Sequence, residues 1–253
     1  HRDGTYILPS LNVELKDGNI FGITKFVLFR PKTRSYDNEI ISTLFFQHAG
    51  FLAPRTTNAY VKYNNQKAKF IFQEAIAKEF LEINDIKEAP IYEGTTKNFL
   101  RVKNSPNINL QNIKLEFIKH RVINEKMSIK SNNHMEMSKT GLSILNNFIE
   151  YYIPNRQIYG EGLNSDYRDY EKNFLKTNYF ENLPAFDSLS VASRSEHSLS
   201  INDRVFYYDP LYSKFIPIHW DGMSYLVDRF NNVIRNERYN VTLTQSIKTG
   251  SKK

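Results

Sequence analysis

The chain has 253 residues, of which 40% are hydrophobic and 14% aromatic, enough to form one large globular domain or two small ones. It contains no cysteine, which excludes disulfides, thiolate zinc sites and a cysteine nucleophile and leaves the cellular compartment open. The formal charge of +7 either favours anionic partners or reflects a generally Lys- and Asn-rich composition. Charged residues occur along the whole length, so we expect no membrane span.

The N-terminal part predicts short strands over residues 5–30, a helix and a hairpin. Residues 24–30 alternate between polar and apolar side chains, which indicates a strand that ends at Arg30. Residues 35–50 begin with capping residues and stop at a glycine, so they predict a helix. Its apolar face consists of Ile40, Ile41, Leu44, Phe45 and Ala49. The next elements are two strands of a hairpin and a short helix, at residues 58–63, 67–74 and 75–82.

The second half predicts mostly helices. Residues 93–133 are polar and ambiguous, with candidate strands or a helix at 113–117 and 119–123. Helical spacing of apolar residues then predicts four helices, at 138–154, 166–180, 185–195 and 225–238. Between the last two of these, the sequence predicts two strands, at 204–208 and 215–220.

The most informative segment is the strand, turn and strand that deliver Asp221 to a strand end, with Asn202 upstream. Carboxylate and amide oxygens are hard ligands, and kinase-like folds place such residues where they hold the magnesium ions of a nucleoside triphosphate. Phosphoryl transfer is therefore our leading hypothesis. The alternative is that Asp221 only starts a turn before Gly222 and that Asn202 only forms an Asx-turn.

Three segments, in this order, resemble the spore-coat CotH kinase family, an atypical branch of the protein-kinase-like fold. The first is a helix followed by Ala-Gly-Phe-Leu-Ala-Pro-Arg at 49–55. The second is a strand that closes on a glutamate, Phe-Ile-Phe-Gln-Glu at 70–74. The third and most specific runs over 207–221, from Tyr-Tyr-Asp-Pro to Pro-Ile-His-Trp-Asp. Together they cover less than half of the chain.

The resemblance implies an α+β fold of the atypical protein-kinase-like type. An N-terminal lobe at residues 1–95, an antiparallel sheet with one helix, would bind the nucleotide. A mainly helical C-terminal lobe at 96–253, containing a short strand pair, would carry the metal and catalytic loops. The implied cofactors are ATP and Mg²⁺, with Asn202 and Asp221 as metal ligands, and the implied substrate is a Ser or Thr hydroxyl of a protein.

In the N-terminal lobe the resemblance assigns nucleotide-binding roles to Arg30, Glu39 and Glu74. Arg30 stands where a kinase has its phosphate-pairing lysine, and Glu39 in the following helix could hold that cation by an ion pair. The rival cations are Lys25, Lys32 and Arg34. Alternatively, Arg30 belongs to a solvated cluster and Glu39 only complements the helix dipole. Glu74 would lie at the link between the lobes, where its side chain could instead cap the next helix.

The position of the catalytic base departs from the family pattern. Kinases of this type carry an aspartate about five residues before the asparagine, whereas this chain has His197, with Glu196 beside it. His197 could accept the hydroxyl proton and Glu196 could orient it or act itself. Gly222 and Met223 replace the second acid that the family has after Trp-Asp. If these departures abolish turnover, the chain is a pseudokinase that serves as a surface or scaffold binding module.

Other classes of function receive less support. The histidines share no zinc-type spacing, and neither a Gly-x-Ser-x-Gly elbow nor a Walker loop occurs. The many tyrosines could form a nucleic-acid stacking face, but at helical and strand spacing they more often pack half-buried, so we do not expect nucleic acid as a partner.

Overall fold

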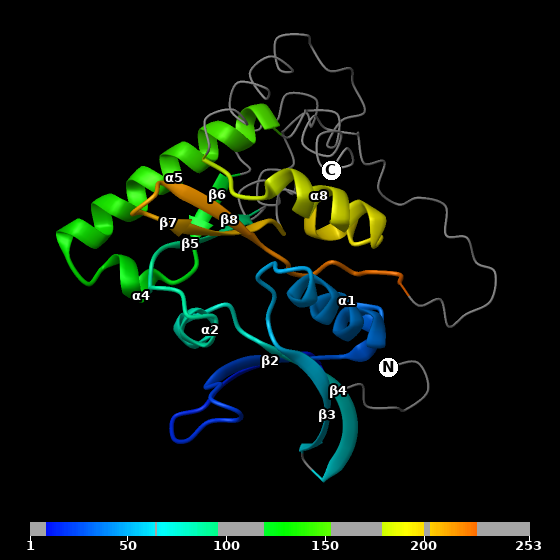
Figure 1. Cartoon of the computed structure of the whole chain (residues 1–253). Coiled ribbons are helices and arrows are strands. Elements are labelled where there is room, and N and C mark those ends of the chain that lie inside the picture. The colour runs from blue at the N-terminus through cyan, green and yellow to red at the C-terminus, as the bar shows by residue number, and fades with distance from the viewer. Residues whose placement is uncertain (1–8, 64, 96–118, 153–178, 200–202, 227–253) are drawn as a thin grey trace, which may run out of the picture.

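The computed structural model describes residues 9–63, 65–95, 119–152, 179–199 and 203–226, and within them it contains two antiparallel four-stranded sheets (Figure 1). The first sheet has the order β1-β2-β4-β3 and the second β6-β5-β7-β8. The strands of the first are β1 Leu11–Glu14, β2 Lys25–Phe29, β3 Thr56–Tyr63 and β4 Gln66–Glu74. Those of the second are β5 Ile91–Thr95, β6 Lys119–Val122, β7 Val205–Asp209 and β8 Lys214–Ile218.

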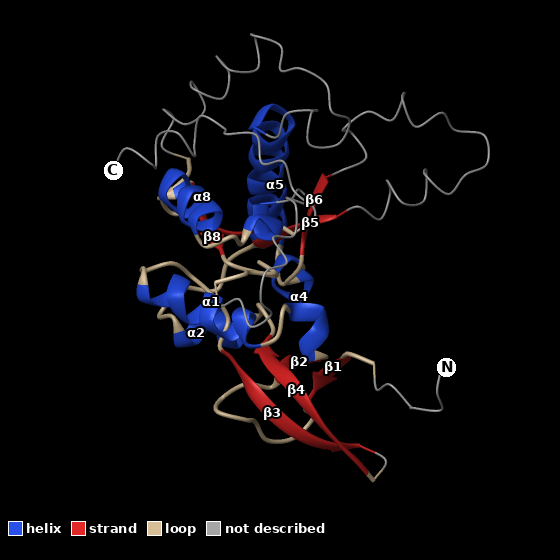
Figure 2. Cartoon of the chain, turned by 90° about the vertical axis from the view of Figure 1, so that its right-hand side faces the viewer, coloured by secondary structure: helices blue, strands red, loops and turns tan. Residues whose placement is uncertain are grey.

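The helices lie between the two sheets and beside the second one (Figures 1 and 2). In both views α1 and α2 lie between the two sheets, while α5 and α8 lie with the second sheet (Figures 1 and 2). The bounds of the helices are η1 Pro31–Arg34, α1 Asp37–His48, α2 Lys78–Ile83, α4 Glu125–Ser128, α5 Asn132–Tyr152, α8 Leu183–Ala192 and η4 Glu196–Leu199. None of the described helices combines the length and hydropathy that crossing a bilayer would require.

Strand alternation divides the second sheet between two cores. On β7, Phe206 and Tyr208 pack with Leu145 and Phe148 of α5, whereas Val205 and Tyr207 face the cluster that contains α2. Successive side chains of a strand point to opposite faces, so the apolar run of β7 is buried on both sides. At Gly141 of α5, an added Cβ would lie 2.4 Å from the Tyr92 hydroxyl, so the glycine allows the helix to approach the sheet closely.

The predicted elements agree with the described ones in type: strand β2, helix α1, the β3-β4 hairpin, α2, α5, α8 and the β7-β8 pair. The strand pair predicted in the C-terminal part is present as β7 and β8, and it belongs to a larger sheet, because β7 also pairs with β5, which pairs with β6. The chain enters this second sheet at Ile91. The predicted element at 113–117 lies outside the described residues, and so do nearly all of those at 166–180 and 225–238.

The buried face of α1 differs from the apolar face that its sequence presents. Ile41, Leu44 and Phe45 are exposed, whereas Glu39, Ser42, Thr43 and Phe46 are buried. These four lie at the i, i+3, i+4 and i+7 spacing of one helical face. The helix therefore turns a largely polar face into the junction between the sheets, where hydrogen-bond partners replace water for its buried polar groups.

His120 of β6 makes stability depend on pH. It is buried near the Phe206 ring, neither ring nitrogen makes a hydrogen bond within the described structure, and burial lowers its pKa to about 3, with Arg204 adding to the shift. The folded chain thus keeps this imidazole neutral while the unfolded chain protonates it at an ordinary pKa of about 6.5. Its contribution to stability is full above that pH and declines as the pH falls towards 3.

We expect His120→Leu to flatten the acid branch of the stability profile. Between about pH 6 and pH 4, the unfolding free energy of the variant should fall less steeply than that of the wild type, by up to about 1.4 kcal/mol per pH unit, because one proton is no longer taken up on unfolding. Urea unfolding at several pH values measures this slope. The exposed His48→Gln is the matched control with an unaltered slope, and equal slopes for His120→Leu and wild type would contradict the prediction.

Candidate functional site

The segment after β8 crosses the junction between the sheets and carries Asp221. Its first residue, His219, is fully buried and stacks on Phe46 of α1, with ring centroids 3.9 Å apart and planes 9° from parallel. His219 Nε2 hydrogen-bonds the Ser42 hydroxyl at 2.8 Å, and the His219 backbone N–H donates to the Leu52 carbonyl at 2.8 Å. The position of Asp221, two residues later, is therefore set by α1 and the loop after it.

A buried serine network holds the same segment to α1 and to η4. The Ser42 hydroxyl lies 2.7 Å from the Ser224 hydroxyl and 3.3 Å from the Ser195 hydroxyl. The Ser195 and Ser224 hydroxyls are also hydrogen-bonded to each other. Ser193 joins the network at 2.9 Å from Ser195. Hydroxyls can both donate and accept, so such a network satisfies buried polar groups on three separate stretches of chain at once.

The backbone around Asp221 is tightly turned. Asp221 and Met223 have positive φ angles of 48° and 46°, in the left-handed region that L-residues seldom adopt. A Cβ added at Gly222 would lie 2.6 Å from His219 Cε1 and 3.1 Å from Ser195 Cβ. No side chain fits at residue 222 without displacing these neighbours, which is a physical reason why an acid does not follow Asp221.

Three side chains converge at this turn: His197, Asp203 and Asp221, with one possible ligand atom from each within 4.8 Å of the others. His197 Nδ1 lies 3.5 Å from Asp203 Oδ2 and 3.8 Å from Asp221 Oδ1. The two carboxylates are hard oxygen ligands of the kind that Mg²⁺ or Mn²⁺ takes. The chemistry of this donor set, two carboxylates close together, fits a divalent cation, although Asp221 Oδ1 already has a cationic partner in Arg34.

His197 is a weaker candidate for a metal ligand than the carboxylates. Its Nδ1 lies 2.8 Å from the backbone carbonyl oxygen of Asp221. A carbonyl oxygen only accepts hydrogen bonds, so Nδ1 carries the proton and its lone pair is not offered to a metal. This contact assigns the basic lone pair of the neutral ring to Nε2.

Arg34 also contacts this cluster, through Asp221. Its Nη1 lies 3.0 Å from Asp221 Oδ1, with only 15% and 12% of the two side chains exposed. The guanidinium lies over the ring of Phe29, 3.9 Å from its centroid, a cation–π arrangement that fixes the plane of the group. A partly desolvated pair of this kind is stronger than an exposed one, because water screens it less.

Glu39 of α1 is a fully buried acid. Its Oε1 accepts a hydrogen bond of 3.0 Å from Gln73 Nε2, while its Oε2 is shielded and accepts none from the described residues. Burial raises the pKa of Glu39 to about 7 against the opposing effects of the Gln73 hydrogen bond and of Arg34 and His197, while Asp221 raises it further. Burial is thus the main reason why Glu39 holds its proton more tightly than an exposed glutamate does.

The predicted site residues are only partly brought together. His197 and Asp221 meet at the turn after β8, while Glu39 is buried on α1 and hydrogen-bonded to Gln73. The Arg30 side chain is exposed, and Arg34, one of the rival cations, forms the ion pair with Asp221. Glu74 ends β4 and forms a two-pronged ion pair with Arg55, at 2.7 and 2.9 Å, which ties β4 to the loop before β3. The side chain of Glu196 and all of Asn202 lie outside the description.

Sequence reasoning missed Asp203, Gln73 and the Ser42–His219 contact. Asp203 directly follows Asn202, so an acid beside the expected metal ligand was a visible signal. Gln73 offered none, because its neighbours in β4 are typical of a strand. The displacement from Arg30 to Arg34 arises from η1, the short helix between β2 and α1 that carries Arg34 next to the turn at Asp221.

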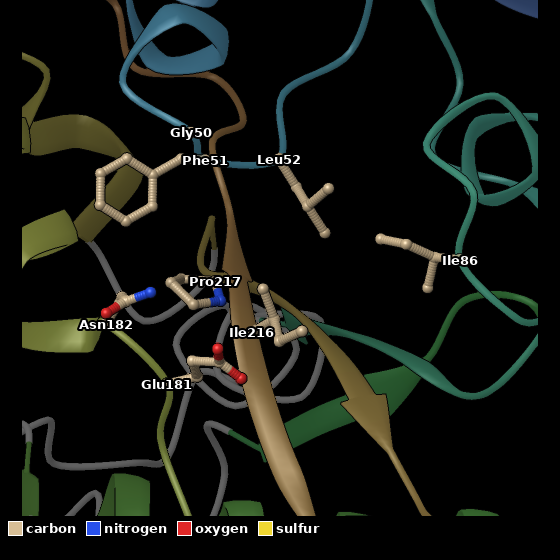
Figure 3. A pocket seen from close by; sticks show the side chains of 8 residues that line it. All are labelled: Gly50, Phe51, Leu52, Ile86, Glu181, Asn182, Ile216 and Pro217. Carbon is tan, nitrogen blue, oxygen red and sulfur yellow. The ribbon is translucent and has the colours of Figure 1, made fainter.

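A separate cavity of about 190 Å³ lies between the loop after α1 and strand β8 (Figure 3). Phe51, Leu52 and Ile86 line it together with Ile216 and Pro217 of β8, and Glu181 and Asn182 form its polar edge. It contains none of the residues of the His197–Asp203–Asp221 cluster. The cavity and the cluster are therefore distinct features of the junction.

Comparison of the chain with protein-family models found no match. Comparison with curated proteins likewise found none. The case for a function therefore depends on the arrangement of Arg34, Glu39, His197, Asp203 and Asp221, and the likeness to the CotH family remains a resemblance of three sequence segments.

Proposed function

We propose that the chain is a CotH-like kinase that uses ATP and a divalent cation to phosphorylate hydroxyl side chains of a protein, within an atypical protein-kinase-like fold. The observation that carries the proposal is that Asp221 lies next to a second carboxylate, Asp203, and forms an ion pair with a cation, Arg34. Metal-binding acids, a phosphate-pairing cation and a helix-borne glutamate are the parts that phosphoryl transfer requires.

Asp203 and Asp221 would hold the cation, which when bound offsets the charge on the transferring phosphate. Arg34 would pair with phosphate oxygens through its planar fork, which suits their geometry better than the point charge of a lysine. Glu39, buried on α1, would keep that guanidinium in place. The net charge of +7 adds a general attraction for an anionic nucleotide.

His197 would take the proton of the acceptor hydroxyl. Its Nδ1–H donates to the Asp221 carbonyl, so the ring is oriented and its lone pair lies on Nε2. This arrangement makes the proton acceptor and the metal-binding carboxylate neighbours on one turn. A histidine base replaces the aspartate that the resemblance would lead one to expect at this point.

The second candidate is a catalytically weakened scaffold that retains nucleotide binding. The close packing around Gly222 favours it, because no carboxylate can follow Asp221 without displacing His219. One fewer acid reduces the charge available to hold a second metal ion. Phosphate transfer measured beside nucleotide binding separates the two candidates.

We expect Asp221→Asn to abolish stabilisation by Mg²⁺·ATP. At a free ligand concentration of about 100 times Kd, the wild type should gain about 2.7 kcal/mol of unfolding free energy, visible as a raised melting temperature. The variant, compared with its own ligand-free form, should gain almost none, because the amide removes a charged ligand oxygen. Asp17→Asn, at an exposed loop position, is the matched control, and full stabilisation of Asp221→Asn would refute this metal site.

We expect His197→Ala to separate binding from chemistry. Transfer of labelled phosphate to a Ser- and Thr-containing protein should fall by about 10²- to 10⁴-fold, the usual contribution of a general base, while the melting shift with Mg²⁺·ATP persists. The exposed His48→Ala should behave as wild type. A wild type that binds nucleotide but transfers no phosphate supports the scaffold instead, and unchanged turnover in His197→Ala removes the histidine from the mechanism.

A further inference from the structure

The hairpin of β3 and β4 has one apolar side and one exposed, basic side. Its far end projects away from the second sheet in both views (Figures 1 and 2). Successive side chains of a strand point to opposite sides, and the apolar side belongs to the core of the first sheet, with Ala59, Val61, Ala68 and Phe70. The other side, which we call the hairpin face, consists of four exposed residues: Tyr60, Lys62, Lys67 and Lys69. Positive charge is therefore the main property that this face offers to a partner.

The positive charge of the hairpin face is poorly balanced. No acidic residue occurs within residues 56–73. Lys69 Nζ lies 3.4 Å from Asp37 Oδ1 of α1. Neither Lys62 nor Lys67, by contrast, forms an ion pair with a described residue. The register sets these two lysines directly opposite each other, and like charges in such a cross-strand pair repel. Carboxylates of a bound partner would offset this repulsion.

The strand β3 forms one edge of the first sheet. Half of the backbone N–H and C=O groups of Thr56–Tyr63 point away from β4, and no other described strand pairs with them. An extended peptide can bind such an edge as an added strand through backbone hydrogen bonds, and its alternate side chains then lie on the side of the hairpin face. Lysines at an edge disfavour pairing with basic or apolar strands, so the strand that fits here is acidic.

The aromatic content of the hairpin face favours a peptide over a nucleic acid. Tyr60 is the one aromatic residue of this face, and 84% of it is exposed. Surfaces that bind single-stranded nucleic acid stack successive bases on several rings. Tyr63 lies three residues later on β3, so strand alternation directs it to the opposite side and no second ring follows Tyr60. A peptide needs no such series, because the aliphatic stems of its side chains can pack on a single ring.

We propose that the β3 edge binds an extended, acidic segment of another protein as an added strand, with the carboxylates of that segment on the side of Lys62, Lys67 and Lys69. This interaction surface goes beyond the proposed function and does not depend on it, because the hairpin face shares no residue with the His197–Asp203–Asp221 cluster. The backbone of the segment supplies hydrogen bonds to β3, and its charges supply selectivity.

The test is binding of a fluorescein-labelled peptide of alternating glutamate and threonine to the full chain, measured by fluorescence anisotropy at low ionic strength. The variant Lys62→Glu/Lys67→Glu should bind the peptide about tenfold more weakly than the wild type, because two attractions become repulsions. The matched control is Lys16→Glu/Lys126→Glu, which changes the net charge equally at exposed lysines outside the hairpin and should bind as the wild type does. Absence of peptide binding to the wild type, or equal losses in the two variants, overturns the inference.

The single variant Lys67→Glu separates binding from folding. It places a carboxylate opposite Lys62, so its melting temperature should equal or exceed that of the wild type. Its affinity for the peptide should nevertheless fall about threefold, because the hairpin face loses positive charge. Unchanged affinity in this variant contradicts the proposed role of the two opposed lysines.

Modified probes separate strand addition from charge attraction and from nucleic-acid binding. Two further peptides, N-methylated on every glutamate or on every threonine, keep all carboxylates, but each lacks the backbone donors along one edge. Strand addition predicts that one of them loses binding, whereas equal affinity for both and for the unmodified peptide shows attraction by charge alone and overturns the added strand. Single-stranded oligothymidylate should bind more weakly than the peptide. Tighter binding of this probe, lost in Lys62→Glu/Lys67→Glu, would assign the surface to nucleic acid and overturn the inference.

Discussion

The hydrogen bond between Ser42 and His219, with the stack of His219 on Phe46, is the interaction on which the rest of the junction depends. It joins a helix next to the first sheet to the segment that leaves the second. Both partners are fully buried, and burial lowers the pKa of His219 to about 3, so the ring is neutral and the contact persists at neutral pH. Loss of the Ser42 hydroxyl would leave the buried His219 Nε2 without its hydrogen-bond partner.

This contact fixes the position of Asp221, two residues after His219. The left-handed backbone at Asp221 and Met223 and the close packing at Gly222 turn the chain back on itself directly after His219. Such a turn persists only where the surroundings hold it firmly. Here the serine network supplies that support, and the carboxylate is presented to Asp203, His197 and Arg34 as a result.

The charged groups of the junction differ in how deeply they are buried. Glu39 is fully buried and its pKa is raised to about 7, whereas the Arg34–Asp221 pair retains some exposure. Removal of a carboxylate from water is costly unless charges or hydrogen bonds offset it. Gln73 offsets only one oxygen of Glu39, which agrees with the raised pKa of this acid.

Local patterns predicted most described elements but not the faces that they bury. The apolar run of β7 and the helical spacing of apolar residues in α1 predicted these elements, because residue spacing along a strand or helix follows from backbone geometry alone. The apolar face of α1 nevertheless lies partly exposed, while its polar face is buried. Burial depends on what packs against the helix, and the partners of Ser42 are more than 150 residues away in the chain.

Local sequence patterns alone predicted the α+β character and the strand that ends just before Asp221, and they named Glu39, His197 and Asp221 as candidate site residues. The packing of distant segments was needed to show that Arg34 and not Arg30 pairs with Asp221, that Asp203 joins the cluster and that Glu74 binds Arg55. The physical reason is that periodicity is a local property, whereas an ion pair or a metal site requires side chains from distant segments to meet within a few ångströms.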